Sequence, residues 1–393
     1  MRILILTHKP PYTYIDGGVL AIRNLMETMA DIGHEVDVLC FETKKHPFLP
    51  PESFPKNIKV ETVFKDTDIK IHEAFIGLFR KGSYNVDRFR SDAFVQKIKE
   101  LINENNYDLV ILESLFSTSY LSIVRGLITC PIIMRSHNVE FKIWERLANE
   151  ETSFLKKKYL EHLCRRLKKY EEETINRLDG IMYISNLDQS YFNFINVPST
   201  VIPFVRNIND SKLAVKPASF FHLGSMDWKP NKNGIQWLLT NVWPMVRKEV
   251  PHATLHLAGK DMPNEYFNRE DEGIFVKDYI ANGDAYMREN GTMVVPLFSG
   301  GGVRIKIIDG LCNGVPIIST SIGAEGIHCT PNEDILIADT VDDFAKRMIE
   351  IAKTPELLEG LNEKSLLLAR TNFSKASIVP KLEVFFNSVM NKN

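Results

Sequence analysis

The sequence contains few cysteines, and they form no recognisable pattern. Its 393 residues include five, which is an odd and scattered set. No two of them form a CxxC pair, and none stands at a spacing from histidine that suits zinc. We therefore expect no zinc site and a reducing, cytosolic setting for Cys40, Cys130, Cys164, Cys312 and Cys329.

Long apolar runs are absent as well. No stretch approaches the ~20 apolar residues that a membrane-spanning helix needs. The first apolar run, residues 3–6, is followed by Thr7 and His8 and is too short for the core of a signal peptide. We expect a cytoplasmic protein that is soluble or at most peripheral to the inner face of a membrane.

Neither sign of charge predominates. The chain has 48 lysines and arginines against 50 aspartates and glutamates, which gives a net charge of −2. This balance removes any bulk electrostatic argument for binding nucleic acid, so an anion site would have to be local. No acidic cluster suited to a metal is evident either, and we expect that no metal is required.

The sequence also lacks the GxGxxG fingerprint, which argues against a dinucleotide-binding fold of the dehydrogenase kind. Repeats at the short periods of solenoid proteins are not visible. What remains is a chain whose length suits about two α/β domains of roughly 150 to 200 residues each. The polar stretch 207–217 is the predicted linker between them.

The most informative stretch that is present is residues 292–326. It begins with the apolar residues of a buried strand, breaks at three glycines and continues for a helix length before a second apolar run at residues 317–320. This pattern is typical of a strand–helix–strand unit in a parallel sheet, whose loops lie together at the strand ends.

The glycine turn of this stretch has the chemistry of an anion site. Glycines let a backbone approach a ligand closely, and the N–H groups at a helix start favour a phosphate. Arg304 and Lys306 add two cations, and Lys306 would share a helix face with Asp309. The pattern predicts a phosphorylated ligand that also carries hydroxyl groups. The alternative is that the glycines only form a turn and that both cations are solvated.

Residues 1–41 repeat the strand–helix–strand pattern. Gly17 and Gly18 open the predicted helix, so their amides can face an anion, whereas Met26 and Met29 belong to its apolar stripe and are interpreted as core. In open parallel sheets ligands bind beyond the carboxyl ends of the strands. Three polar residues of this half fall there: His8, Glu113 and His137.

His137 has two readings that its position alone does not separate. A histidine titrates near neutrality and can exchange hydrogen bonds with a sugar or carbonyl oxygen. Alternatively, His137 is a loop histidine before a helix that is capped by Ser136 or Asn138.

A dense basic run follows at residues 156–169, within a helical pattern over residues 153–178. Such a helix can lie on anionic lipid or hold a lipid-phosphate acceptor. A charged helix of this kind is more often simply solvated, and three glutamates at residues 171–173 partly neutralise it. We favour the solvated reading and keep peripheral membrane contact as the alternative.

Five segments together resemble a known enzyme family. They are DGG in the first loop, RSHNVE after a mid-domain strand, FHLGSMDWKPNKNG, VKDYI, and PLFSGGGVRIKIIDGLCNGVPIISTSIGAEGI. In this order they are similar to the retaining glycosyltransferases of family 4, and to a subgroup with a GGGxRxK pattern. The resemblance covers nearly the whole chain and is weakest over residues 42–90.

The resemblance implies an α/β fold of the GT-B type, with two Rossmann-like domains whose parallel sheets face each other across a cleft. Residues 1–206 would form the acceptor-side domain. Residues 207–374 would form the nucleotide-sugar-binding domain. The last helix, residues 375–393, would pack back on the first domain.

The resemblance also implies the site residues. Arg304 and Lys306 would supply charge for the donor diphosphate, and His137 would contact the transferred sugar, so these three are the expected catalytic residues. Asp309 stands where the family has the second of two glutamates eight apart, which bonds the donor ribose. The first of that pair would fall on Gly301 and is absent here.

The remaining expected contacts are with the donor. The loop of Gly17 and Gly18 would close over it, and Tyr279 lies where the family has its base pocket. The full set of expected donor-binding residues is Gly17, Gly18, Gly224, Ser225, Lys229, Tyr279, Gly301, Gly302, Val303, Asp309 and Glu325.

The implied function is retaining transfer of a hexose-type sugar from a UDP- or GDP-linked donor to a glycan, lipid-linked or other acceptor, without metal or cofactor. A cell-surface polysaccharide context is expected because many relatives act there. Two alternatives stay open, a non-catalytic GT-B protein that grips a nucleotide or sugar and a nucleotide-sugar epimerase. A phosphorylase would usually need a pyridoxal lysine and a much longer chain.

Overall fold

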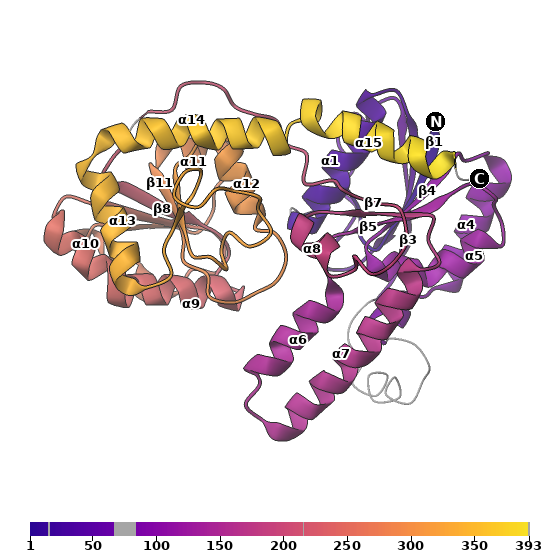
Figure 1. The fold of residues 1–393 in the computed structure, drawn as a ribbon, viewed down its shortest axis with the longest axis horizontal. Coiled ribbons are helices and arrows are strands. Elements are labelled where there is room, and N and C mark those ends of the chain that lie inside the picture. The colour runs from indigo at the N-terminus through magenta and orange to yellow at the C-terminus, as the bar shows by residue number, and fades with distance from the viewer. Residues whose placement is uncertain (15, 67–83, 215, 392–393) are drawn as a thin grey trace. The chain divides into compact units, whose positions relative to one another are not determined.

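The computed structural model describes residues 1–14, 16–66, 84–214 and 216–391 (Figure 1). The chain divides into two compact units. The first unit comprises Met1–Val205 together with Ile378–Asn393, and the second comprises Arg206–Ser377.

The first unit is built on a seven-stranded parallel sheet, in the order β3-β2-β1-β4-β5-β6-β7. Its central strands β1 and β4 are buried apart from Arg2 and are almost continuously apolar, as expected when helices cover both faces of a parallel sheet. The strands are β1 Arg2–Thr7, β2 Glu35–Glu42, β3 Ile58–Phe64, β4 Leu109–Glu113, β5 Ile132–Ser136, β6 Gly180–Tyr183 and β7 Ser199–Val201.

The helices of the first unit include one from the far end of the chain. Helix α15 buries Ile378, Leu382 and Phe386 in the same core cluster as β1. It approaches β6 closely, because a Cβ on Gly180 would lie only 2.8 Å from the ring of Phe385. The described α-helices are α1 Gly17–Asp31, α3 Tyr84–Asp87, α4 Asp92–Glu104, α5 Leu121–Arg125, α6 Glu140–Glu150, α7 Phe154–Ile175, α8 Asn186–Ser190 and α15 Lys375–Met390.

The second unit is built on a six-stranded parallel sheet, in the order β10-β9-β8-β11-β12-β13. Phe220, Leu255 and Val294 join Trp243 in its core. Its strands are β8 Ser219–Leu223, β9 Thr254–Ala258, β10 Ile274–Lys277, β11 Thr292–Val295, β12 Ile317–Ser319 and β13 Leu336–Ile337. Its α-helices are α9 Lys229–Trp237, α10 Trp243–Glu249, α11 Gly283–Glu289, α12 Ile305–Cys312, α13 Val341–Lys353 and α14 Pro355–Asn372.

The predicted strand–helix–strand unit of residues 292–326 is confirmed as β11, α12 and β12. The predicted stripe in α1 is also core, since Met26 and Met29 are fully buried. The alternative in which Ser136 or Asn138 caps α6 is wrong, because the cap residue is Val139 and Ser136 donates to the carbonyl of Asn138.

Two other predictions about helices had different outcomes. The sequence predicts a loop over residues 224–232 and then a helix to about Val250, but α9 already begins at Lys229, with Pro230 in the first turn, where its missing N–H is tolerated. The single helix predicted to follow is divided by a π-helical segment, Leu238–Val242, before Pro244. The sequence also predicts a helix near Ile71, and that segment lies outside the described residues.

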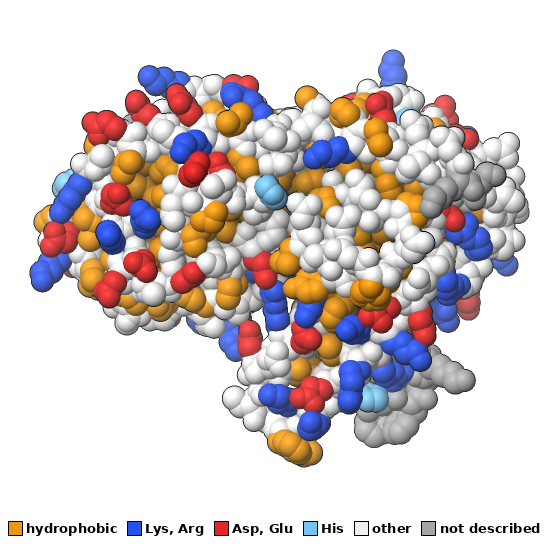
Figure 2. Space-filling view, in the orientation of Figure 1, with side chains coloured by type: hydrophobic (Ala, Val, Ile, Leu, Met, Phe, Trp, Pro, Cys, Tyr) orange, Lys and Arg blue, Asp and Glu red, His pale blue; other side chains and the backbone are white. Residues whose placement is uncertain are grey.

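The surface carries both signs of charge. On the face drawn in Figure 2, lysine and arginine side chains are interspersed with aspartate and glutamate on both units. Within the described part of the chain, no helix is both long and apolar enough to cross a membrane.

Candidate active site

The carboxyl ends of β8 and β11 bring two glycine loops of the second unit together. Gly224 and Ser225 follow β8, and the three glycines at residues 300–302 follow β11. The loops are connected by Lys306 of α12, whose Nζ lies 2.5 Å from the place that a Cβ on Gly224 would occupy. A side chain at position 224 would collide with the lysine, which explains why this position is glycine.

Lys306 is held by two acceptors from other elements. Its Nζ donates to Oδ1 of Asn231 at 2.9 Å and contacts Nε2 of His222 at 3.1 Å. Because Nδ1 of His222 lies 2.9 Å from the carbonyl oxygen of Val294, the ring proton is on Nδ1 and Nε2 accepts from the lysine. The ammonium group therefore has a fixed position beside Gly224.

The protonation of this group is perturbed. Burial, reinforced by the charge of Arg304, lowers the pKa of Lys306 to about 7. Burial, followed by the charge of Lys306, also lowers the pKa of His222 well below its usual value. A lysine whose pKa lies near neutrality is a candidate for binding an anionic ligand, since the ligand restores the charged form.

Arg304 lies inside the glycine turn. It is buried, and its Nη1 donates to the carbonyl of Gly301 at 2.5 Å and also to that of Gly302. The guanidinium stands 5.5 Å from the ring centre of Trp228. Gly300 and Gly302 have φ angles of 102° and 75°, which favour glycine. The arginine thus braces the turn that precedes α12. Val303 lies between Gly302 and Arg304 in the chain.

Asp309 lies on α12, in an ion pair that the sequence reading missed. Its Oδ1 is 2.7 Å from Nη2 of Arg206, which is also 3.8 Å from Asp284. Burial raises the pKa of Asp309 to about 6, against the opposing charge of Arg206. Arg206 comes from a segment more than a hundred positions away, so no local pattern could have marked it.

The remaining predicted donor contacts are more open. Lys229 is exposed at the start of α9, Tyr279 is 75% exposed after β10, and Glu325 is half-buried after β12. Lys229 begins a helix that follows β8, and Tyr279 and Glu325 lie in the loops that follow β10 and β12, on the side of the sheet where ligands bind in open parallel sheets.

The first unit has a charged cluster at the corresponding edge of its own sheet. His137 is buried after β5, and its Nε2 contacts Oε2 of the fully buried Glu113, which ends β4. Nη1 of Arg135 is 3.7 Å from the other carboxylate oxygen and donates to the carbonyl of Ala21 at 2.7 Å. Because a carboxylate only accepts, Nε2 of His137 holds a proton.

Burial and charge act in opposite directions on this pair. Burial by itself would raise the pKa of Glu113, but the charges of Arg135 and His137 hold it below the usual value. Burial lowers the pKa of His137, although Glu113 opposes the shift. The arrangement keeps Glu113 ionised and fixes the orientation of the imidazole.

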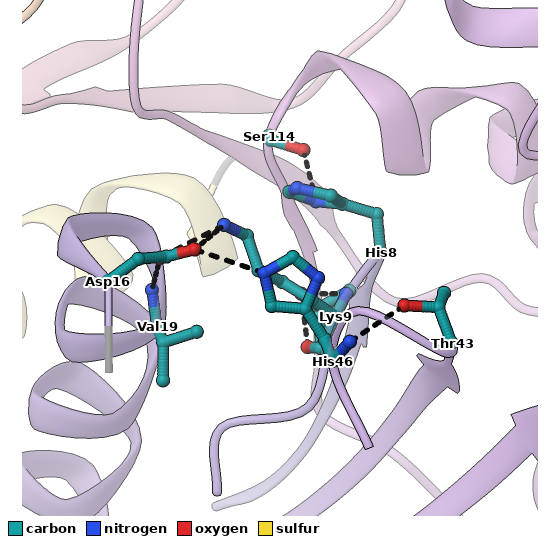
Figure 3. A network of polar contacts seen from close by, with 8 residues as sticks. His8, Lys9, Asp16, Val19, Thr43, His46 and Ser114 are labelled. Carbon is teal, nitrogen blue, oxygen red and sulfur yellow. Dashed lines mark hydrogen bonds and ion pairs between the residues drawn. The ribbon is translucent and has the colours of Figure 1, made fainter. Parts of the chain in front are cut away.

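A second polar network surrounds the start of α1 (Figure 3). Asp16 caps this helix by accepting from the backbone N–H of Val19 at 2.8 Å. It also accepts from Nζ of Lys9 at 2.8 Å and contacts Nε2 of His46 at 3.2 Å. Although burial would raise the pKa of Asp16, these neighbours lower it to about 2, with Lys9 contributing most.

Gly17 and Gly18 begin α1 beside this network. A Cβ on Gly18 would lie 3.0 Å from Nζ of Lys9, so the glycine allows the lysine to reach the helix start. His8, which follows β1, contacts Ser114 at 3.0 Å. Sequence reading identified His8 and both glycines but missed Lys9, Asp16 and His46. The aspartate before two glycines was an available signal, because aspartate is a preferred cap.

The described residues contain no group of three or more His, Cys, Asp or Glu side chains that could hold a metal ion.

Comparison with known proteins gives the same class for both halves of the chain. Residues 15–207 match the model of Glycosyltransferase Family 4, and residues 217–354 match that of Glycosyl transferases group 1. The chain belongs to the group 1, family 4 glycosyltransferases, and its two Rossmann-like units form the GT-B fold. The glycosyl-transfer activity of the family is therefore that of this protein.

Individual relatives are distant. A protein of Klebsiella pneumoniae, described as an uncharacterized 44.6 kDa protein in the cps region, is 24% identical over 403 aligned residues and is matched over 100% of both chains. Sucrose-phosphate synthase from Thermosynechococcus elongatus has a similar structure, with a TM-score of 0.71, 15% identity and 100% coverage of both chains.

Two further solved structures share the fold. WaaG, a glycosyltransferase involved in lipopolysaccharide biosynthesis, has a TM-score of 0.63 at 13% identity, over 98% of this chain and 99% of its own. The Anabaena protein HepE, solved in complex with UDP and glucose, has a TM-score of 0.65 at 14% identity, over 99% of this chain and 100% of its own.

Proposed function

We propose that the protein transfers a hexose from a nucleoside-diphosphate sugar to a hydroxyl group of a glycan or lipid-linked acceptor, with retention at the anomeric carbon. The observation that carries this proposal is Lys306, held between Gly224, Asn231 and His222 with a pKa of about 7. A lysine with so low a pKa binds an anion by regaining its proton, and a diphosphate beside a glycine turn is such an anion.

The donor would react by loss of its nucleoside diphosphate. As the bond between the anomeric carbon and the phosphate oxygen breaks, negative charge grows on the diphosphate and positive charge on the sugar. Arg304, Lys306 and the N–H groups at the start of α12 would stabilise the departing charge. The fixed positions of both cations mean that little reorganisation is needed during the reaction.

The first unit would contribute the contact to the sugar. His137, with its Nε2 proton directed to Glu113, presents an imidazole of fixed orientation. The resemblance assigns such a histidine to the transferred sugar. Gly17 and Gly18 would approach the donor from the start of α1, where Lys9 supplies a neighbouring charge.

The first donor to test is a UDP-sugar, with GDP-sugars as the alternative. HepE was solved in complex with UDP and glucose, which favours uridine among relatives of the same fold. The ribose would be bonded by Asp309 and the base would lie near Tyr279. No metal would take part, because the two cations supply the charge.

The acceptor class follows from the same comparisons. WaaG acts in lipopolysaccharide biosynthesis, and the Klebsiella relative is encoded in a cps region. Both favour a role in cell-surface polysaccharide synthesis. With a lipid-linked acceptor, the enzyme would work in the cytoplasm at the inner face of a membrane, in contact with it through the basic residues 156–169.

A panel of UDP-, GDP- and ADP-sugars tests the proposal in the presence of EDTA. A donor at a hundred times its dissociation constant stabilises the fold by about 2.7 kcal/mol, which a thermal shift detects. We expect one sugar nucleotide to stabilise the protein and to lose its sugar to a polysaccharide-derived acceptor. Stabilisation by every donor tested without any transfer would favour a binding protein, and interconversion of two sugar nucleotides would favour an epimerase.

A further inference from the structure

Helices α6 and α7 form a hairpin that extends from the sheet of the first unit (Figure 1). The chain turns over residues 151–153, and the first two residues of α7 are apolar and exposed, with Nζ of Lys158 6.0 Å from the ring centre of Phe154. Phe154 is 71% exposed and Leu155 is 78% exposed. Figure 2 shows hydrophobic side chains gathered at the tip of this hairpin, with charged side chains along its length.

The base of the hairpin is anchored by hydrogen bonds. Glu171, which is fully buried on α7, accepts from the backbone N–H groups of Glu140 at 3.3 Å and Phe141 at 3.2 Å. Cys164 and Leu167 are buried along the same helix. The apolar tip is therefore presented on a braced element and is not a loose loop.

Three lysines follow the apolar pair, at residues 156–158. Beyond them, exposed side chains recur every three or four residues along α7 and are mostly basic or aromatic. Glu150 at the end of α6 and Glu151 in the turn reduce the local charge, and Glu161 forms an ion pair with Lys158 at 3.0 Å. The exposed stripe consists of Leu155, Lys158, Tyr159, His162, Arg165 and Lys169.

We propose that the tip of the α6–α7 hairpin docks on an anionic lipid bilayer. Phe154 and Leu155 enter the headgroup region, and Lys156, Lys157 and Lys158 contact lipid phosphates. The charge pattern favours lipid over a protein partner, because lysine is depleted in protein interfaces, whereas apolar side chains beside lysines are typical of interfacial helices. The proposal rests on the proposed function for the identity of the lipid-linked acceptor and names the surface that would hold the enzyme beside it.

Sedimentation with lipid vesicles tests this surface. We expect the intact protein to bind vesicles of phosphatidylcholine with phosphatidylglycerol far more tightly than vesicles of phosphatidylcholine alone. The double change Phe154→Ser and Leu155→Ser should weaken this binding about tenfold or more, because two apolar side chains no longer leave water. Changing the three lysines to glutamine should weaken it on the order of 10²-fold.

The matched control is Leu367→Ser, on α14 of the second unit. Leu367 is 62% exposed, so its change removes one exposed apolar side chain at another place. We expect the control to bind vesicles like the unchanged protein. The sugar nucleotide should raise the melting temperature of every variant as much as that of the unchanged protein. This measurement reports on the donor site and not on the docking surface.

Three results would overturn the inference. The first is absence of binding to anionic vesicles by the unchanged protein. The second is equal binding by the Phe154/Leu155 variant, and the third is self-association in solution that this variant abolishes, which would make a second copy the occupant. If no donor stabilised the protein, the proposed function would be contradicted. The vesicle experiment would still test the docking surface independently.

Discussion

Lys306 donates a hydrogen bond to Nε2 of His222, 3.1 Å away, from a position 84 residues further along the chain. The tautomer of His222 is set by the carbonyl of Val294, so the imidazole accepts from the lysine and holds it without adding charge. The site therefore combines a fixed geometry with a cation whose charge depends on its ligand. This combination has a consequence for the pH dependence of donor binding.

Donor affinity should fall above about pH 7. The pKa of Lys306 is about 7 in the free protein, and a bound diphosphate would raise it. Below pH 7 the lysine is charged in both states, so Lys306 adds no pH dependence to the affinity there. Above pH 7 the free lysine is neutral and must take up a proton on binding, which weakens affinity by up to about tenfold for each pH unit.

Calorimetry of a UDP-sugar, or of whichever donor stabilises the protein, checks this dependence. Titrations in buffers of different ionisation enthalpy should show proton uptake above pH 7. Lys306→Arg is the control, because arginine stays charged and should bind with little change over the same range. Affinity that is level through this range in the unchanged protein would contradict the assignment of Lys306 to the diphosphate.

Gly224→Ala should damage the site more than the fold. The new Cβ would lie 2.5 Å from Nζ of Lys306 and 2.7 Å from Nδ2 of Asn231, so the lysine has to move. Because only the end of the lysine side chain has to leave its two acceptors, the fold should lose only about 1 kcal/mol. Donor affinity should fall on the order of tenfold through loss of one charged contact. Chemical denaturation and donor titration measure the two effects.

Gly360→Ala provides the matched comparison for that change. A Cβ on Gly360, inside α14, meets nothing within 4 Å. Alanine should therefore stabilise the helix by about 0.5 to 1 kcal/mol and leave donor binding unchanged. If both alanine variants bound the donor like the unchanged protein, Gly224 would have no part in the site.

Arg304→Ala should lower turnover on the order of 10² to 10³. The change removes a cation from the glycine turn together with its hydrogen bonds to Gly301 and Gly302. Arg288 is the control, because it also donates to backbone carbonyls of the second unit but lies outside the proposed site. Arg288→Ala should reduce stability by about 1 kcal/mol and keep turnover. Unchanged turnover in folded Arg304→Ala protein would remove this residue from the site.

The sequence was sufficient for local features. Apolar runs and glycine turns predicted β11, α12 and β12, and the 3.6-residue periodicity placed Met26 and Met29 in the core. These features depend on residues that are close in sequence, so their pattern is visible without a structure. The short strand β13 was missed because two residues carry no alternation.

Long-range pairs could not be predicted. The bonds of Lys306 to His222 and Asn231, and the ion pair of Asp309 with Arg206, join segments separated by about 75 to over 100 positions. Such pairs arise only when the sheet brings the carboxyl ends of its strands together. The exposed apolar tip of the α6–α7 hairpin was also missed, because two apolar residues before a basic run look like ordinary core in the sequence.

Glu113→Ala should destabilise the first unit strongly. The alanine would leave Arg135 and His137 buried without their carboxylate, and removal of one partner from a buried ion pair costs about 3 to 5 kcal/mol. The pKa of Glu113 is lower in the folded protein than in the unfolded chain. The carboxylate therefore stabilises the fold at pH values above the unfolded pKa, and this stabilisation is lost as the pH falls through the folded pKa. The difference in stability between the unchanged protein and Glu113→Ala should therefore shrink in acid.

The conservative variant Glu113→Gln separates this structural effect from the chemistry. Glutamine keeps an oxygen that can accept a hydrogen bond from Nε2 of His137. It removes the negative charge of Glu113, which raises the pKa of His137 against the effect of burial. If His137 acts through its fixed orientation, Glu113→Gln should retain most turnover where it is folded, whereas His137→Ala should not. Urea denaturation across pH and turnover of both variants provide the measurements. A Glu113→Ala protein as stable as the unchanged one would show that the carboxylate is not paired as described.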